Sequence, residues 1–133
     1  MRDFALRPYH RGRDSGAHRV EVEADGAFFF NGGCDDGTAA LDVGYTGLDR
    51  DDDGLARVRI EAPGTGRAAT LWMDAAYEYL MVFTGDTLSP AARRRGLALE
   101  PMTCAPNALQ SGDGLVVLEP GASHSGKWGI CPG

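Results

Sequence analysis

The sequence predicts an all-β fold, an antiparallel β-sandwich with at most one short helix. Glycine makes up 19 of the 133 residues, about twice its usual share, and such an excess is typical of chains with many turns. Short apolar or alternating runs recur between clusters of Gly, Pro and Asp, as they do in sandwiches. Together these features predict roughly seven to nine short strands.

The clearest alternation lies in the first half of the chain. Residues His18–Glu23 alternate His or Val with charged residues, which predicts a half-buried strand. Phe28–Phe30 follows the Asp25–Gly26 turn and is the expected hairpin partner of that strand. Leu41–Leu48 is a short extended segment broken by glycine, and Ala56–Ala62 alternates again.

The second half predicts further strands and one helical segment. Ser89 and Pro90 form an N-cap followed by proline at the first helical position. A helix of about two turns at most is therefore expected through Arg95, because Gly96 ends it. The remaining apolar runs are predicted as strands: Ala68–Met73, Tyr79–Thr84, Leu97–Leu99, Leu115–Leu118 and Lys127–Ile130.

Length and charge exclude several classes of function. A chain of 133 residues has the size of one domain, so residues 1–133 are predicted to form a single domain. The net charge of -6 disfavours nucleic acid and anionic membranes as partners, because both need a basic face. No apolar run approaches transmembrane length and Met1–Arg7 carries no apolar signal region, so a cytoplasmic protein is expected.

The cysteines indicate neither a disulfide framework nor a metal site. Cys34, Cys104 and Cys131 are odd in number and widely spaced, with no CxxC pair and no zinc-ligand spacing. Free thiols in a reducing compartment are the expected state.

Two loops copy known ligand motifs but each lacks a required residue. Asp49–Gly54 begins like a calcium loop, yet the position of the bidentate glutamate is Ile60. A charged hairpin turn is the better interpretation. Gly121–Lys127 has the spacing of a phosphate loop, but Trp128 stands where Ser or Thr is needed and no helix can follow. We therefore expect no metal and no cofactor.

Glu100 stands out among the acidic residues, because an apolar run ends there and a Pro-bracketed loop follows. A strand fixes such a carboxylate while the loop leaves it open, which suits a functional residue. The pattern by itself fits a plain surface carboxylate as well. Glu119 ends the second apolar run and is predicted to belong to a framework strand.

Four segments together resemble the C-terminal part of the aldose 1-epimerases, also called galactose mutarotases. They are LDVGYTGL at Leu41–Leu48, WMDAAYEYLMVFTGDTL at Trp72–Leu88, GLALEPMTCAPNA at Gly96–Ala108 and LVVLEPGASHSGKWGI at Leu115–Ile130. The resemblance covers residues 41–130 well and residues 1–40 poorly. It implies that the sandwich is part of a galactose mutarotase-like supersandwich.

The resemblance also implies an activity and two site residues. Members of this family interconvert the α and β anomers of an aldose by acid–base ring opening, without metal or nucleotide. By resemblance Glu100 is the general base and Asp42 accepts hydrogen bonds from sugar hydroxyls.

The chain departs from the family pattern at three places. Arg7–Tyr9 looks like the family's His-Pro-Tyr motif with arginine in place of the acid histidine, and arginine cannot act as a general acid. His10 could replace it only if the backbone were repositioned. Met81 stands where the family often has a sugar-binding glutamine, and the chain is less than half a typical member's length.

Three functional hypotheses follow from these matches and departures. The chain is a truncated epimerase that is weakly active or inactive alone, a carbohydrate-binding pseudoenzyme, or a sandwich remnant. The remnant would be completed by another chain, since deletion of half a sandwich leaves exposed strand edges that favour self-association. In the first two hypotheses the ligand is an aldose sugar, whose identity the sequence leaves open.

Overall fold

The protein was analysed as a computed structural model. It describes side chains and backbone for residues 40–60, 67–93 and 96–132, and backbone strands for residues 7–8, 19–22, 28–31 and 61–62. The all-β prediction is confirmed, because the described part contains nine strands and one four-residue helix. No helix in the described part is long and apolar enough to span a membrane.

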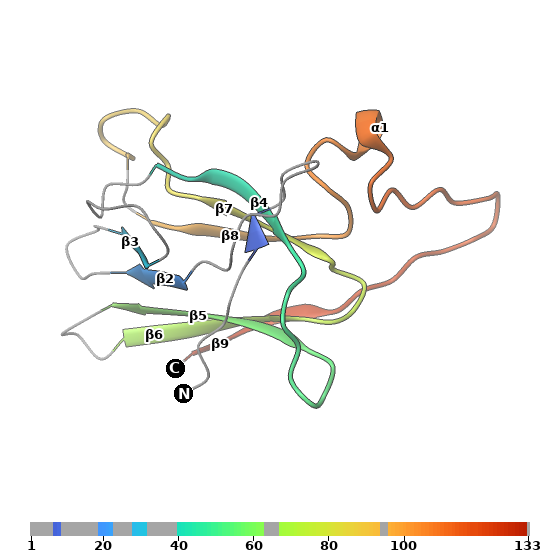
Figure 1. The fold of residues 1–133 in the computed structure, drawn as a ribbon, viewed down its shortest axis with the longest axis horizontal. Coiled ribbons are helices and arrows are strands. Elements are labelled where there is room, and N and C mark those ends of the chain that lie inside the picture. Colours follow the sequence, from blue (N-terminus) through green and yellow to red (C-terminus); the bar gives the residue numbers. More distant parts are fainter. Residues whose placement is uncertain are drawn as a thin grey trace.

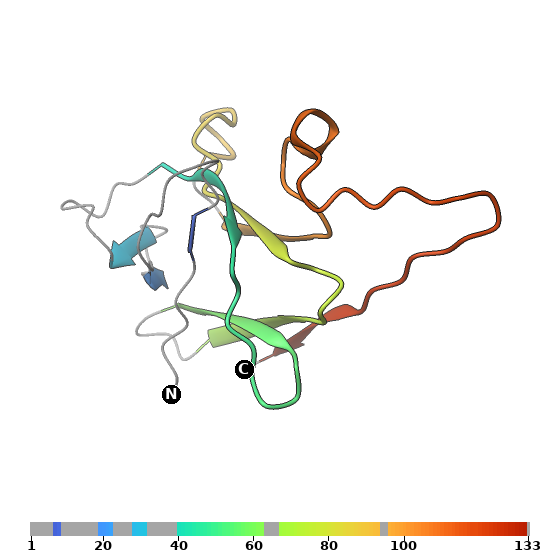
Figure 2. The same cartoon turned by 45° about the vertical axis from the view of Figure 1, so that its right-hand side comes forward.

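The strands form two main antiparallel sheets and a separate hairpin. Sheet 1 has the order β1-β4-β7-β8, and sheet 2 has the order β5-β6-β9. The bounds in sheet 1 are β1 Arg7–Pro8, β4 Asp42–Thr46, β7 Tyr79–Phe83 and β8 Ala98–Met102. Those in sheet 2 are β5 Ala56–Ala62, β6 Arg67–Met73 and β9 Trp128–Pro132. Figures 1 and 2 show the two sheets as layers, with β4 and β7 over β5 and β6.

The hairpin confirms the predicted pairing in the N-terminal region. It consists of β2 (Arg19–Val22) and β3 (Phe28–Asn31), which pair antiparallel with Val22 opposite Phe28. The predicted Asp25–Gly26 turn lies outside the described residues, as do Cys34 and His10.

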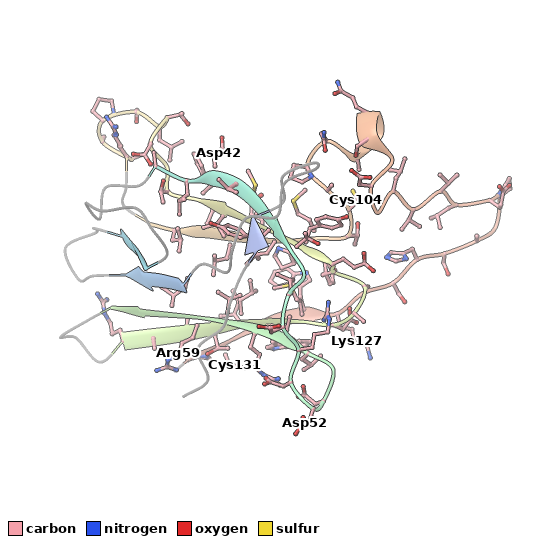
Figure 3. All side chains as sticks on the ribbon, viewed as in Figure 1. Asp42, Asp52, Arg59, Cys104, Lys127 and Cys131 are labelled. Carbon is pink, nitrogen blue, oxygen red and sulfur yellow. The ribbon has the colours of Figure 1, made fainter. Side chains whose placement is uncertain are left out.

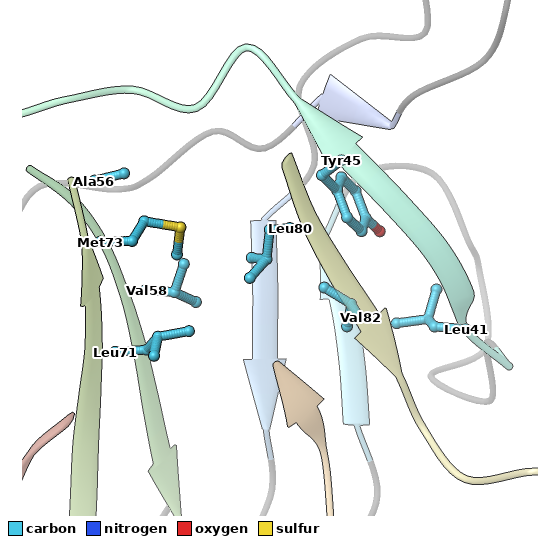
Figure 4. Close-up of a cluster of buried hydrophobic side chains, with 8 residues drawn as sticks. All are labelled: Leu41, Tyr45, Ala56, Val58, Leu71, Met73, Leu80 and Val82. Atoms are coloured by element: carbon cyan, nitrogen blue, oxygen red, sulfur yellow. The ribbon is translucent and has the colours of Figure 1, made fainter. Parts of the chain in front are cut away.

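The hydrophobic core lies between the two sheets, as alternation along the strands requires. Sheet 1 contributes Tyr45, Leu80 and Val82, all nearly inaccessible to solvent. Sheet 2 contributes the buried Leu71 and Met73, and Figure 4 shows these side chains facing one another. Every second residue of β4 and β7 therefore points inward, and the residues between them lie on the opposite face.

The charged segment Asp49–Gly54 is a turn, as predicted, but the strands β4 and β5 that it joins lie in different sheets and form no hairpin. Ion pairs hold the turn. The Arg57 guanidinium contacts the Asp51 carboxylate at 2.7 Å and the Asp53 carboxylate at 2.6 Å. Gly54 adopts a positive φ of 78°, which glycine tolerates best. Among the described residues no group of three or more His, Cys, Asp or Glu side chains could hold a metal ion.

One predicted strand is wrong, and with it the predicted place of Glu119. Leu115–Leu118 is not a strand, and its side chains are exposed. Glu119 accordingly lies in an exposed loop and not in a framework strand. An apolar run becomes a strand only where a neighbouring strand can pair with its backbone, and within the described part of the chain none pairs with this one.

The predicted helix at Ser89 is a single hydrogen-bonded turn. The Ala92 and Arg93 N–H groups both donate to the Ser89 carbonyl at 2.9 Å, and residues 94–95 lie outside the described part. The described helix, α1, spans Ala108–Ser111 instead and ends at Gly112 in the left-handed conformation. A four-residue helix has too little periodicity to be read from sequence.

Candidate functional site

The outer face of sheet 1, which points away from the core, carries the predicted site residues. The register places one set of alternate residues on this face: Asp42, Gly44 and Thr46 from β4, Tyr79, Met81 and Phe83 from β7, and Ala98, Glu100 and Met102 from β8. This set includes both carboxylates and the methionine named from the sequence. Leu80 and Val82, which alternate with them, are buried in the core.

Asp42 and Glu100 lie in neighbouring rows across this face. Gly44, Met81 and Glu100 are directly opposite one another, and Asp42 lies in the next row, opposite Phe83. The two carboxylate-bearing residues are thus two strands and two residues apart, or about 12 Å between Cα atoms by ordinary sheet spacing. Both are exposed, whereas Met81 between them is half-buried. A small polar ligand could therefore contact both carboxylates at once, with Met81 beneath it.

Thr84 and Asp86 fix the position at which β4 begins. The fully buried Thr84 hydroxyl accepts a hydrogen bond from the Leu41 N–H at 2.9 Å, and the Thr84 N–H donates to the Leu41 carbonyl at 3.0 Å. The same hydroxyl donates a hydrogen bond to the Asp86 carboxylate. Because Leu41 precedes Asp42 directly, these bonds hold the candidate sugar-binding carboxylate at the start of its strand.

The sequence shows these two positioning residues only as part of a matched motif. Thr84 and Asp86 belong to the Phe-Thr-Gly-Asp stretch quoted above, but nothing in the spacing indicates that Thr84 is buried or bonded to residue 41. A contact between residues 43 positions apart depends on how β4 and β7 pair.

The loop after β8 folds back over the outer face of sheet 1 and borders the site on one side. We call residues 103–114 the site loop. A Cβ at Gly44 would lie 2.7 Å from the Pro106 Cγ, so the loop contacts the backbone of β4. Ala105 and Ala108 are buried, and the Ala105 N–H donates to the Asp113 carbonyl at 3.1 Å. The site loop is thus packed against the sheet as well as hydrogen-bonded to itself.

Tyr79 lies under the site loop, in the row next to Glu100. Its ring packs against Gly114, where a Cβ would lie 2.9 Å from the Tyr79 Cε2. Burial, followed by the negative charges of Asp113 and Glu78, raises the pKa of the Tyr79 phenol. Tyr79 therefore stays protonated and uncharged across the physiological pH range.

A shallow apolar hollow of about 440 Å³ opens beside the site loop and α1. Its lining includes Met102, Cys104, Pro106, Leu109 and Leu115. Of the cysteines that the structure describes, Cys104 is a half-buried free thiol and Cys131 an exposed one, as predicted (Figure 3). The lining carries no charged side chain, so the hollow does not resemble the polar surface that carries Asp42 and Glu100.

The position of the expected acid lies at the far edge of the same sheet. The backbone of Arg7 pairs with Thr46, and Pro8 pairs with Tyr45. Arg7 is therefore in register with the row that contains Thr46 and Tyr79. Of the histidines, only His124 has a described side chain. It is exposed, and it lies shortly before β9, far from β4 in the sequence. The described outer face of sheet 1 thus contains no imidazole.

Comparison with known proteins gives one partial match. The chain is 46% identical over 46 residues to the uncharacterized protein YihR of Escherichia coli strain K12. This match covers 35% of the chain and 14% of YihR. No family profile and no solved structure matches the chain. The similarity to YihR indicates a distant relationship over about a third of the chain.

Proposed function

We propose that the outer face of sheet 1 is a monosaccharide site of the aldose 1-epimerase type. The observation that carries the proposal is the strand register, which sets Asp42, Met81 and Glu100 in adjacent rows of one face, with both carboxylates exposed. The same segments are those whose sequence resembles the epimerases. Sugar recognition requires polar groups fixed on a rigid element, and both carboxylates extend from paired strands.

In this proposal Glu100 is the general base. Its carboxylate removes the proton from the C1 hydroxyl of the sugar while the ring oxygen takes up a proton from solvent water, and the C1–O5 bond opens to give the aldehyde. Rotation about C1–C2 and reclosure then yield the other anomer. Asp42 accepts hydrogen bonds from sugar hydroxyls and holds the ring while it reacts.

A second candidate function is sugar binding without catalysis. It is favoured by the residue at the acid position, because Arg7 remains protonated at working pH and cannot donate and recover a proton. Met81 adds to this argument, since a thioether cannot make the hydrogen bonds of a glutamine. We therefore expect weak or no mutarotation by this chain alone, together with measurable sugar binding.

Polarimetry of freshly dissolved α-D-glucose and α-D-galactose separates the two functions. A mutarotation rate that falls about a hundredfold or more in Glu100→Gln, and not in the control Glu119→Gln, would establish catalysis by Glu100. Glu119 suits the comparison because it is exposed in a loop. A rate equal to that of buffer in every variant would reject the epimerase function.

Calorimetric titration with the same sugars tests the binding site itself. We expect the heat of binding to disappear in Asp42→Asn and to persist in the control Asp52→Asn, which changes an exposed carboxylate in the charged turn. Heat that is absent from the unaltered chain, or that survives Asp42→Asn, would contradict a sugar site on this face.

A further inference from the structure

The connection between the site loop and β9 carries a large exposed apolar surface. We call residues 115–127 the arm. In Figures 1 and 2 the arm extends away from both sheets before it returns to β9. Its outgoing limb, Leu115–Leu118, is apolar, and all four side chains are at least 40% exposed. Val117 is 76% exposed.

The arm is anchored where it rejoins the sheet. The Asp74 N–H donates to the Lys127 carbonyl at 2.9 Å, and the Lys127 N–H donates to the Asp74 carboxylate at 2.8 Å. A Cβ at Gly126 would lie 2.7 Å from the Tyr77 ring, so this end is packed closely. The base of the arm is therefore fixed in direction, and the exposed limb lies beyond it.

The adjoining strand β9 carries two further exposed apolar side chains. Trp128 and Ile130 lie opposite Met73 and Leu71, so their side chains share the inner face of sheet 2. Nevertheless Trp128 is 52% exposed and Ile130 is 64% exposed, whereas Met73 and Leu71 are buried. On the outer side of β9, Gly129 lies against a neighbouring ring, since a Cβ there would be 2.7 Å from the Trp72 ring. Sheet 1 therefore leaves the inner face of β9 uncovered.

Among the described strands, none pairs with the main chain of β9 along its side away from β6. The Asp74–Lys127 hydrogen bond identifies that pair as a hydrogen-bonded one, and such pairs alternate along an antiparallel ladder. Gly129 and Cys131 thus direct their backbone groups toward β6, whereas Trp128 and Ile130 direct theirs away from it. β9 is the last strand of sheet 2.

We propose that this surface, formed by Leu115–Leu118, Trp128 and Ile130, binds a second copy of the same chain. In the complex, β9 pairs antiparallel with β9 of the partner subunit about a two-fold axis at Ile130. Sheet 2 then continues from one copy into the other. The apolar limbs of both arms are buried against the joined sheet.

The edge of β9 is complementary to itself in this register. Ile130 would exchange both backbone hydrogen bonds with the partner subunit's Ile130, and the Trp128 N–H would donate to the carbonyl of the partner subunit's Pro132. Pro132 has no N–H of its own, and it falls at the end of the strand, where no bond is lost within the sheet. The Trp128 ring then faces the Pro132 ring across the axis.

The size and charge of the surface favour a second copy as the occupant. The six apolar residues expose roughly 600 Å², the upper limit for the largest patch on a typical monomer. With the strand edge this approaches the roughly 800 Å² per partner of a stable complex. Residues 115–132 contain one Glu and one Lys and are formally neutral, although the chain carries a net charge of -6. Two copies can therefore approach here without charge repulsion.

Light scattering during size-exclusion chromatography of the full chain tests this assembly. We expect the mass of a dimer at high micromolar concentration and dissociation on dilution. Ile130→Lys and Val117→Lys place like charges at the interface and should each weaken the dimer about a hundredfold. Leu109→Lys is the matched control, because Leu109 is 91% exposed on α1 and lies outside the surface. Far-UV circular dichroism verifies that each variant is folded.

Cysteine crosslinking tests the register independently. In a Cys131→Ser background, Ile130→Cys would lie opposite itself across the axis and should form a disulfide-linked dimer on oxidation. Leu109→Cys in the same background should form no disulfide-linked dimer. A monomer at every concentration would overturn the proposal. So would a dimer unaffected by Ile130→Lys and Val117→Lys, or equal crosslinking at residues 109 and 130.

Discussion

The site loop and the arm are consecutive parts of one connection, yet they are ordered by different means. The site loop folds back over sheet 1, buries Ala105 and Ala108 and contacts Gly44 of β4. The arm has more large apolar side chains but leaves them exposed. Apolar content by itself therefore does not decide whether a segment packs. A segment packs where the rest of the fold offers it a surface and a partner for its backbone.

The largest difference in stability between the site loop and the arm is expected when a charged side chain is placed in each of them. Ala105→Asp buries a carboxylate at a position that is 1% exposed, and we expect it to cost about 3–5 kcal/mol of unfolding free energy. Val117→Asp changes a residue that is 76% exposed and should change stability by about 0.5 kcal/mol or less. Urea denaturation at low micromolar concentration, where self-association is negligible, measures both values. Equal losses would show that the two regions are packed alike.

A smaller effect is expected where the site loop touches the sheet. Gly44→Ala places a methyl group 2.7 Å from the Pro106 Cγ, which forces the loop away from β4. We expect a loss of about 1–3 kcal/mol and faster hydrogen exchange of the Ala105 amide, which is bonded within the loop. Gly96→Ala is the control, since nothing lies within 4 Å of the added atom there. Unchanged exchange in Gly44→Ala would mean that the contact with Pro106 does not hold the loop.

The smallest effect is expected in the charged turn, because the side chains of its ion pairs are partly exposed to solvent. The Arg57 guanidinium lowers the pKa of Asp53 from 3.8 to about 2. A lowered folded-state pKa stabilises the fold above pH 4, and this contribution is lost as the pH falls from about 4 to about 2. Asp53→Asn should remove a small part of the acid sensitivity of the thermal midpoint in that window, and Asp52→Asn should not. Identical profiles for both variants would contradict a stabilising role for the Arg57 pair.

The sequence predicted those parts of the fold that depend on local alternation and turn chemistry. The strand at Ala56–Ala62 is confirmed, as are the hairpin of β2 with β3 and the charged turn between β4 and β5. In each case the pattern that predicts the element lies in residues next to one another in the sequence. The predicted helix start at Ser89 forms one hydrogen-bonded turn, whereas the four-residue helix α1 was not predicted.

The candidate site was only partly predictable. Asp42 and Glu100 were named from a resemblance, and their roles remain predictions. The register could not be read from the sequence, nor could the buried Thr84 hydroxyl that fixes the start of β4. A shift of one residue between β7 and β8 would have moved Glu100 to the core face, since side chains alternate across a strand.

Alternation and turns could be located in the sequence, because these properties depend on residues next to one another. Which segments pair with a neighbour became evident in the folded structure. Leu97–Leu99 and Leu115–Leu118 look alike as sequence, but the first leads into β8, which pairs with β7, and the second remains exposed in the arm. A strand forms only where its backbone can hydrogen-bond to a neighbouring strand, and the local sequence does not specify that neighbour.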